Sequence, residues 1–181
     1  MKNIACAFTG HRPKSFPWKY DETARECILL KEALAAQIVA LAERGVTDWF
    51  SGMAQGVDLW AAEMVLTLRE KNPALALHCV LPCEGQECKW TVPMQRQYRS
   101  VLERANDVTY VGREYSSDCM LKRNRYLVDN SPILLAVYSG AYRSGTGMTV
   151  RYAKKLGREI IIINPISREV THTCRNFVPG G

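Results

Sequence analysis

The chain has 181 residues and a formal net charge of +6, with 47% hydrophobic and 23% charged residues. This length suits one domain with a real core, and the composition excludes a disordered chain. No uninterrupted apolar stretch reaches the length of a membrane-spanning helix. The positive charge permits an anionic partner without requiring one.

The N-terminus enters a strand pattern at once and lacks the apolar core of a signal peptide. We therefore expect a cytoplasmic protein that does not associate with membranes. We expect one domain over residues 1–181, in which residues 164–181 form a weakly patterned C-terminal tail.

Apolar runs and helical periodicity alternate along the chain. The pattern predicts strands at 3–9, 46–51, 74–81, 107–111, 133–138 and 160–163. It predicts helices at 22–44, 57–71, 94–105, 117–129 and 148–156, with an irregular segment at 83–93. Strands that alternate with helices indicate an α/β fold, a Rossmann-like doubly wound and mainly parallel sheet with helices on both faces.

In such sheets the ligand lies beyond the carboxyl ends of the strands, so the loops that follow the strands are the candidate site. Three of these loops are rich in small residues. The predicted ligand-binding residues are Gly10, His11 and Arg12 after the first strand, Ser51, Gly52, Gly56 and Asp58 after the second, and Ser139, Gly140, Ser144, Gly145, Thr146 and Gly147 before the last helix. Strand, glycine loop and helix in this order place free N–H groups where a phosphate or carboxylate can bind.

Some of these residues have a second interpretation. Arg12 at a strand end could grip a phosphate or carboxylate, or could be a solvated loop residue. Asp58 could accept a hydrogen bond from a ribose hydroxyl, or could only complement the dipole of its helix. Trp60 recurs with Met64 and Leu68 at helical spacing, which favours a place in the core over a base-stacking role.

The seven cysteines are odd in number and form no CxxC pair, which argues against a disulfide framework. His78, Cys79, Cys83 and Cys88 form the one suggestive cluster. A structural zinc site needs four ligands at tighter paired spacings, and Cys79 falls within a predicted strand. We therefore expect reduced thiols and no metal or cofactor.

Three motifs resemble the YpsA-like branch of the SLOG superfamily: TGHRP, SGMAQGVDLWAAE and NRYLVDNSPILLAVYSGAYRSGTGMTVRYAKK. That superfamily also includes the LOG phosphoribohydrolases and the DprA/Smf DNA-binding proteins. The resemblance covers most of the chain. It implies a Rossmann-like domain that binds a nucleotide or nucleotide-derived ligand, and a homo-oligomer.

The LOG enzymes carry a Met-His-x-Arg-Lys motif whose arginine serves the nucleotide site, and the resemblance assigns that role to Arg123. They also carry Gly-Thr-x-x-Glu, whose glutamate acts in cleavage of the bond between base and ribose. Thr149 stands at the glutamate position, and we expect its side chain to point toward the ligand held by Gly145 and Thr146. A hydroxyl cannot replace a carboxylate in stabilising the charge that develops on the sugar.

Three functions follow from these observations. The leading hypothesis is a binding or sensing protein for a nucleotide-derived small molecule. The enzymatic alternative is a nucleoside 5'-monophosphate phosphoribohydrolase that uses Asp58, or another acid, in place of the missing glutamate, with Arg123 as the other candidate catalytic residue. The third alternative is single-stranded nucleic-acid binding of the DprA kind, through Lys122, Arg123, Arg125, Arg143, Arg151, Lys154 and Lys155.

Overall fold

The computed structural model describes residues 3–173. Its strands are β1 (Ile4–Gly10), β2 (Val46–Ser51), β3 (Ala76–Leu81), β4 (Asp107–Tyr110), β5 (Ile133–Val137), β6 (Glu159–Ile163) and β7 (Val170–Thr173). Its helices are α1 (Arg25–Glu43), α2 (Val57–Arg69), α3 (Val92–Arg104), α4 (Cys119–Asp129) and α5 (Gly145–Lys155), with a 3-10 turn, η1 (Pro13–Ser15), after β1. The predicted α/β class is confirmed.

The seven strands form one sheet in the order β4-β3-β2-β1-β5-β6-β7. All neighbours pair in parallel except β6 and β7, which are antiparallel. From β1 the chain builds outward through β2 and β3 to β4, and then crosses to β5 on the other side of β1. The strand order therefore reverses between β1 and β5, the position at which doubly wound sheets bind ligands.

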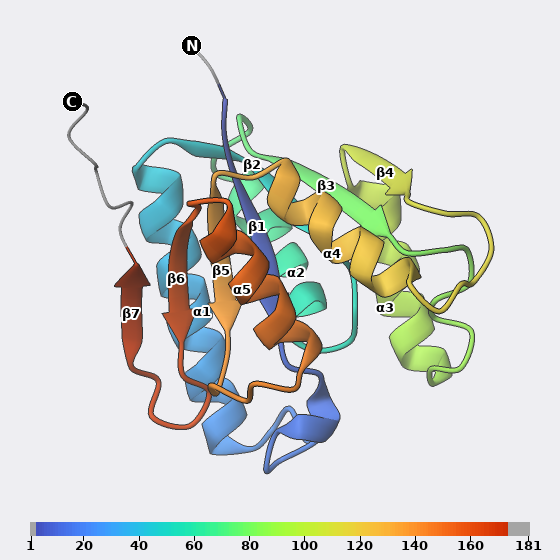
Figure 1. Cartoon of the computed structure of the whole chain (residues 1–181), viewed down its shortest axis with the longest axis horizontal. Coiled ribbons are helices and arrows are strands. Elements are labelled where there is room, and N and C mark those ends of the chain that lie inside the picture. The colour runs from blue at the N-terminus through green and yellow to red at the C-terminus, as the bar shows by residue number, and fades with distance from the viewer. Residues whose placement is uncertain (1–2, 174–181) are drawn as a thin grey trace.

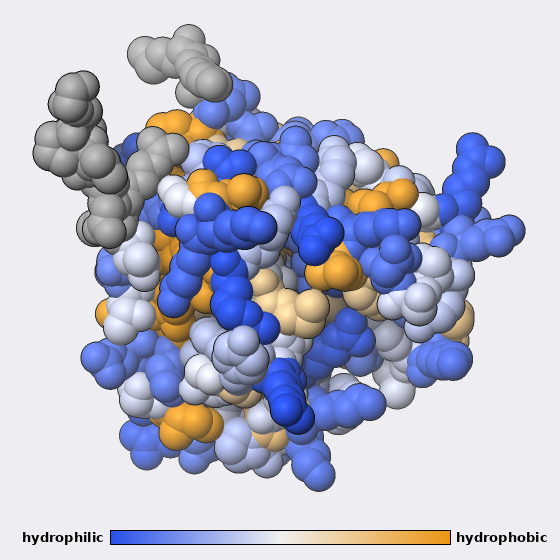
Figure 2. Space-filling view, viewed as in Figure 1, coloured by the Kyte–Doolittle hydropathy of each residue, from blue (hydrophilic) through white to orange (hydrophobic). Residues whose placement is uncertain are grey.

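Helices cover both faces of this sheet. Helices α4 and α5 lie over the near face in Figure 1, and α1, α2 and α3 lie over the far face. In Figure 2 the side chains on the near side of the molecule are mainly hydrophilic, and the hydrophobic ones form small separate patches.

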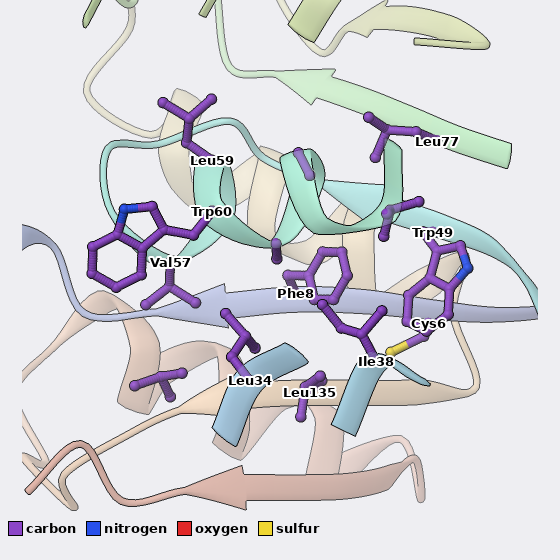
Figure 3. Packing of buried hydrophobic residues seen from close by; sticks show 14 of the residues in the cluster. Cys6, Phe8, Leu34, Ile38, Trp49, Val57, Leu59, Trp60, Leu77 and Leu135 are labelled. Carbon is purple, nitrogen blue, oxygen red and sulfur yellow. The ribbon is translucent and has the colours of Figure 1, made fainter. Parts of the chain in front are cut away.

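The larger part of the core lies under α1 and α2, where inward-facing residues of β1 and β2 meet the apolar faces of the two helices. Phe8 stacks on Trp49 with ring centroids 5.6 Å apart. Leu34 and Ile38 of α1 approach the same strands (Figure 3). Trp60 is buried in this cluster, as its helical spacing predicted. A smaller cluster packs α4 and α5 against the other face and includes Ala7, the β1 residue between Cys6 and Phe8.

Gly10, the last residue of β1, is required by the close approach of α2. A Cβ atom at this position would lie 2.5 Å from Cβ of Val57, the first residue of α2. Such a separation is far below van der Waals contact between carbon atoms. The glycine therefore brings the beginning of α2 directly against the end of the central strand.

The predicted elements differ from the observed ones by up to three residues at their ends, so that α5 already begins at Gly145, within the predicted glycine loop. Two of the differences have an evident cause. Helix α1 begins at Arg25 instead of Glu22, because Asp21 accepts a hydrogen bond from the Thr23 amide and Glu22 binds Lys31 and the indole of Trp60. The tail contains the unpredicted strand β7, which exists because it pairs with β6 and not because its own four residues alternate strongly. Residues 174–181 of the predicted tail lie outside the described residues.

The cysteines of the described segment are free thiols, and Cys174 lies outside that segment. Cys79 is fully buried in β3, whereas both ring nitrogens of His78 bond carboxylates, those of Asp48 and Asp107. In residues 3–173 no group of three or more His, Cys, Asp or Glu side chains is placed to hold a metal ion. No helix in this segment has both the length and the apolar character needed to cross a bilayer.

The contact between Gly10 and Val57 gives a test of the fold. Gly10→Ala should lower the free energy of unfolding by about 1–3 kcal/mol, the usual cost of overpacking. Gly145→Ala is the matched control, because no atom lies within 4 Å of its added Cβ. Urea denaturation of both variants measures the difference. Adding Val57→Ala should recover part of the loss in Gly10→Ala; equal stability of the two single variants would contradict the packing argument.

Candidate functional site

A cavity of about 430 Å³ lies at the carboxyl ends of β1 and β5, where the strand order reverses. Four segments that are distant in the sequence enclose it: the loop after β1, the beginning of α2 with the loop before it, one face of α4, and the beginning of α5. Its lining residues are Thr9, Gly10, His11, Arg12, Lys14, Ser15, Ala54, Asp58, Met120, Arg123, Asn124, Arg143, Ser144, Gly145 and Thr146. Four of these side chains are cationic and one, Asp58, is acidic.

His11 connects the loop after β1 to the loop after β5. Its Nε2 atom lies 3.0 Å from the backbone nitrogen of Ser139 and 3.0 Å from the Ser139 hydroxyl. Because the amide can only donate, Nε2 is an acceptor and the ring is neutral with its proton on Nδ1. Burial lowers the pKa of His11, which favours the same neutral form. His11 therefore holds the two loops together at the edge of the cavity.

Asp58 lies in the first turn of α2 and is 7% exposed. Its Oδ2 accepts a hydrogen bond of 3.3 Å from the amide of Ala54, and Ser51 Oγ donates to the Asp58 carbonyl at 2.9 Å. Burial raises the pKa of the Asp58 carboxyl, and the nearby charge of Arg123 opposes that increase. Ser51 thus positions the loop, and Asp58 presents a desolvated carboxyl group to the cavity.

Arg123 extends from α4 toward the end of β2 and is only 3% exposed. Nη1 donates to the carbonyl of Gly52, and Nε donates to Oδ1 of Asn124 at 2.9 Å. A Cβ on Gly52 would lie 2.5 Å from Nη1, so glycine is needed for the guanidinium to fit. Burial lowers the pKa of Arg123 while Asp58 raises it, and arginine stays charged in proteins.

The N-terminus of α5 forms the opposite wall. Ser144 caps the helix, because its Oγ accepts a 2.9 Å bond from the Gly147 amide. The carbonyl of Ser144 accepts a hydrogen bond of 3.0 Å from the amide of Met148. These bonds use the amides of Gly147 and Met148 and leave those of Gly145 and Thr146 at the cavity. The positive end of the helix dipole adds to the attraction for an anion at this point.

The structure brings most of the predicted residues to one cavity. Gly10, His11, Arg12, Asp58, Arg123, Ser144, Gly145 and Thr146 line it. Ser51, Gly52, Gly56, Ser139, Gly140 and Gly147 do not line it but shape its loops; Gly56 and Gly140 have φ of 88° and 91°, which favour glycine.

The prediction for Thr149 is wrong. Its hydroxyl donates a hydrogen bond of 2.9 Å to the carbonyl of Gly145, one turn earlier in α5. The residue is buried and does not line the cavity. The hydroxyl of a helical threonine commonly bonds a preceding carbonyl in this way. Thr149 therefore contributes to the packing of the helix and not to the cavity wall.

Sequence reasoning missed several lining residues, among them Lys14, Ser15, Met120 and Asn124, and it assigned Arg143 only to the nucleic-acid-binding alternative. Lys14 and Ser15 follow Pro13 in the 3-10 turn after β1, which turns the chain back along the sheet edge. Met120 and Asn124 flank Arg123 on one face of α4, at positions i−3 and i+1. The helical spacing of Met120 and Arg123 was the one available signal.

Asp58 makes the free energy of unfolding depend on pH. Its raised pKa means that the folded chain keeps a proton that the unfolded chain has already lost. The stability of the wild type relative to Asp58→Asn should therefore fall as the pH rises above 3.8, the ordinary value for aspartate. Chemical denaturation of both proteins at several pH values above 3.8 gives the difference between their free energies of unfolding. The other acidic residues contribute equally to both proteins, so their effect is absent from this difference. A difference that grows with pH would show that ionised Asp58 is favoured by folding.

Comparisons with known proteins agree with this architecture. The chain is similar to the X-ray structure of TM1055, a structural genomics target, with a TM-score of 0.56 and 16% identity; the alignment covers 90% of this chain and 75% of that one. At this identity the likeness shows the fold alone.

Proteins found by sequence comparison share a higher identity with this chain than TM1055 does. The chain is 34% identical to a UPF0398 protein of Halalkalibacterium halodurans over 139 residues, 75% of this chain and 73% of the relative. It is 32% identical to the UPF0398 protein YpsA of Bacillus subtilis over 136 residues, 73% and 74% of the two chains. The family model described as the YspA SLOG family matches residues 6–166. The chain therefore belongs to the YspA SLOG family.

Proposed function

We propose that this protein binds a nucleotide or nucleotide-derived small molecule in the cavity between β1 and β5, and acts as a sensor or regulator. The observation that carries the proposal is the combination of the α5 N-terminus with four cationic side chains around one cavity. A volume of about 430 Å³ lies within the range of small-molecule sites. A phosphate group at the amides of Gly145 and Thr146 satisfies both donors.

The rest of the cavity suits a sugar and a base. The carboxyl group of Asp58 can accept hydrogen bonds from ribose hydroxyls, as acidic residues do in dinucleotide-binding folds. Asn124 offers an amide that can both donate and accept, although its Oδ1 already accepts from Arg123. Phosphate, sugar and base can therefore be recognised by α5, α2 and α4 in turn.

Binding without hydrolysis is favoured by the position of the acids. Thr149 provides no carboxylate, and in the described segment Asp58 is the acidic residue that lines the cavity. Its Oδ2 is bonded to the Ala54 amide and its pKa is raised by burial. An enzyme of the phosphoribohydrolase type would have to use this one buried group for all its acid–base chemistry.

Nucleic-acid binding has less support, because the cations proposed for it are divided among different surroundings. Arg123 and Arg143 line the cavity. The guanidinium carbon of Arg125 lies 5.5 Å from the ring centroid of Tyr152, and that of Arg151 lies 4.1 Å from the ring centroid of Tyr142. These contacts hold Arg125 of α4 against α5, and Arg151 of α5 against the loop that precedes that helix.

A charge placed at the beginning of α5 tests the phosphate site. Gly145→Asp should abolish or weaken nucleotide binding by at least about tenfold, because a carboxylate repels the phosphate. An acidic residue in the first helical turn favours the helix, so this variant should remain folded. Gly145→Asn has the same shape without the charge and is the control.

Thermal shift against the common nucleoside monophosphates and inorganic phosphate provides the measurement. A ligand at one hundred times its dissociation constant should stabilise the wild type by about 2.7 kcal/mol. The proposal fails if no compound shifts the wild type, or if Gly145→Asp and Gly145→Asn respond to nucleotides alike.

A second prediction is that the wild type releases no free base from nucleoside monophosphates. Loss of one group that stabilises developing charge typically lowers a rate by a hundred- to a thousandfold, about 2.7–4 kcal/mol. Chromatography of each monophosphate after incubation with the protein detects adenine, guanine, cytosine or uracil. Steady release that disappears in Asp58→Asn would establish the phosphoribohydrolase instead.

A further inference from the structure

Two arginines of the cavity, Arg12 and Arg123, converge on one atom. Nη2 of Arg123 lies 3.6 Å from Sδ of Met120, one turn earlier on α4. Nη2 of Arg12, from the loop after β1, lies 3.8 Å from the same sulfur. Two arginines from distant parts of the sequence thus direct their guanidinium groups at a single point on the cavity wall.

The sulfur is a poor partner for two cations. A thioether is only a weak acceptor, whereas an anionic oxygen forms short charge-assisted bonds with guanidinium groups. Within residues 3–173 neither arginine makes an ion pair with a carboxylate. Each positive charge is unfavourable for the other, and the pKa of the buried Arg123 is lowered by burial and also by the charge of Arg12.

The two guanidinium groups come from other elements than the phosphate position at α5. The α5 position is formed by the amides of Gly145 and Thr146, whereas the two guanidinium groups come from the β1 loop and from α4. Both positions belong to the same cavity, so one small molecule can reach both. A ligand with two phosphate groups can offer one to the α5 amides and the other to the two guanidinium groups.

We propose that Arg12 and Arg123 form a second anion subsite, which the sulfur of Met120 covers, and that the ligand is a nucleotide with two phosphate groups. This inference rests on the proposed function, because it takes the first phosphate to bind at α5. The second phosphate displaces the thioether and accepts hydrogen bonds from both guanidinium groups. Met120 is flexible and unbranched, so it can move aside without a change in the backbone of α4.

The experiment compares three ligands for each base: the nucleoside 5'-monophosphate, the 5'-diphosphate and the 3',5'-bisphosphate. Isothermal titration calorimetry of the wild type should show at least one two-phosphate ligand that binds about tenfold or more tightly than the monophosphate. The 5'-diphosphate carries its second phosphate on the first, whereas the 3',5'-bisphosphate carries it on the other side of the ribose. Comparing the two ligands shows which arrangement fits the second subsite. Arg12→Ala should lose this ratio, whereas Arg99→Ala, an exposed arginine on α3, should keep it.

Met120 supplies the variants that test its covering role. Met120→Glu places a carboxylate between the two guanidinium groups and should remove the preference for two phosphates while raising the melting temperature. Met120→Leu keeps an apolar side chain of similar size but has no sulfur acceptor, so the preference should be kept or increased. A preference lost in Met120→Leu and kept in Met120→Glu would overturn the role of Met120.

The outcomes separate this inference from the proposed function. If the wild type binds mono- and two-phosphate ligands equally, and Gly145→Asp abolishes both, the α5 site stands and the second subsite is overturned. A preference for two phosphates that survives in Arg12→Ala also overturns it. If the wild type binds none of these nucleotides, both proposals fail.

Discussion

The buried guanidinium of Arg123 ties α4 to the carboxyl end of β2, and the geometry of the cavity depends on this contact. A charge that is 3% exposed must be bonded to be tolerated, and here the carbonyl of Gly52 and the amide oxygen of Asn124 accept its protons. A side chain at 52 would occupy the observed position of the guanidinium, so glycine leaves room for it there. The same contact places Met120 and Asn124 on the cavity wall, since both share a helix face with Arg123.

A similar close approach governs the other side of the cavity. Because Gly10 has no side chain, α2 begins directly over the end of β1, and Asp58 in its first turn reaches the space between β1 and β5. His11 accepts a hydrogen bond from the amide of Ser139 and so links the loop after β1 to the loop after β5. Cationic and acidic groups thus meet at the switch point of the sheet because backbone segments approach closely there.

The wall of the cavity at α5 offers backbone groups, whereas the other walls carry charged side chains. The wall at α5 presents backbone amides, which no substitution of a neighbouring side chain removes, whereas the side chains of Arg12, Lys14 and Arg143 are exposed. Thr149 turns back to the carbonyl of Gly145, so the helix contributes a dipole and two amides but no acid. The beginning of α5 therefore presents amide donors and no carboxylate to the cavity.

The sequence by itself determined the alternation of strands and helices, the parallel sheet and the loops that carry the site, because hydrophobic periodicity and glycine positions are local properties of the chain. It also indicated Arg12, Asp58 and Arg123. Only the tertiary structure decided that Met120 lies between two arginines and that Lys14 and Arg143 reach the cavity, because these positions depend on where distant segments meet. Strand β7 and the direction of Thr149 were missed for a related reason: each is determined by a hydrogen-bonding partner, the edge of β6 or the Gly145 carbonyl, which hydrophobic patterning does not reveal.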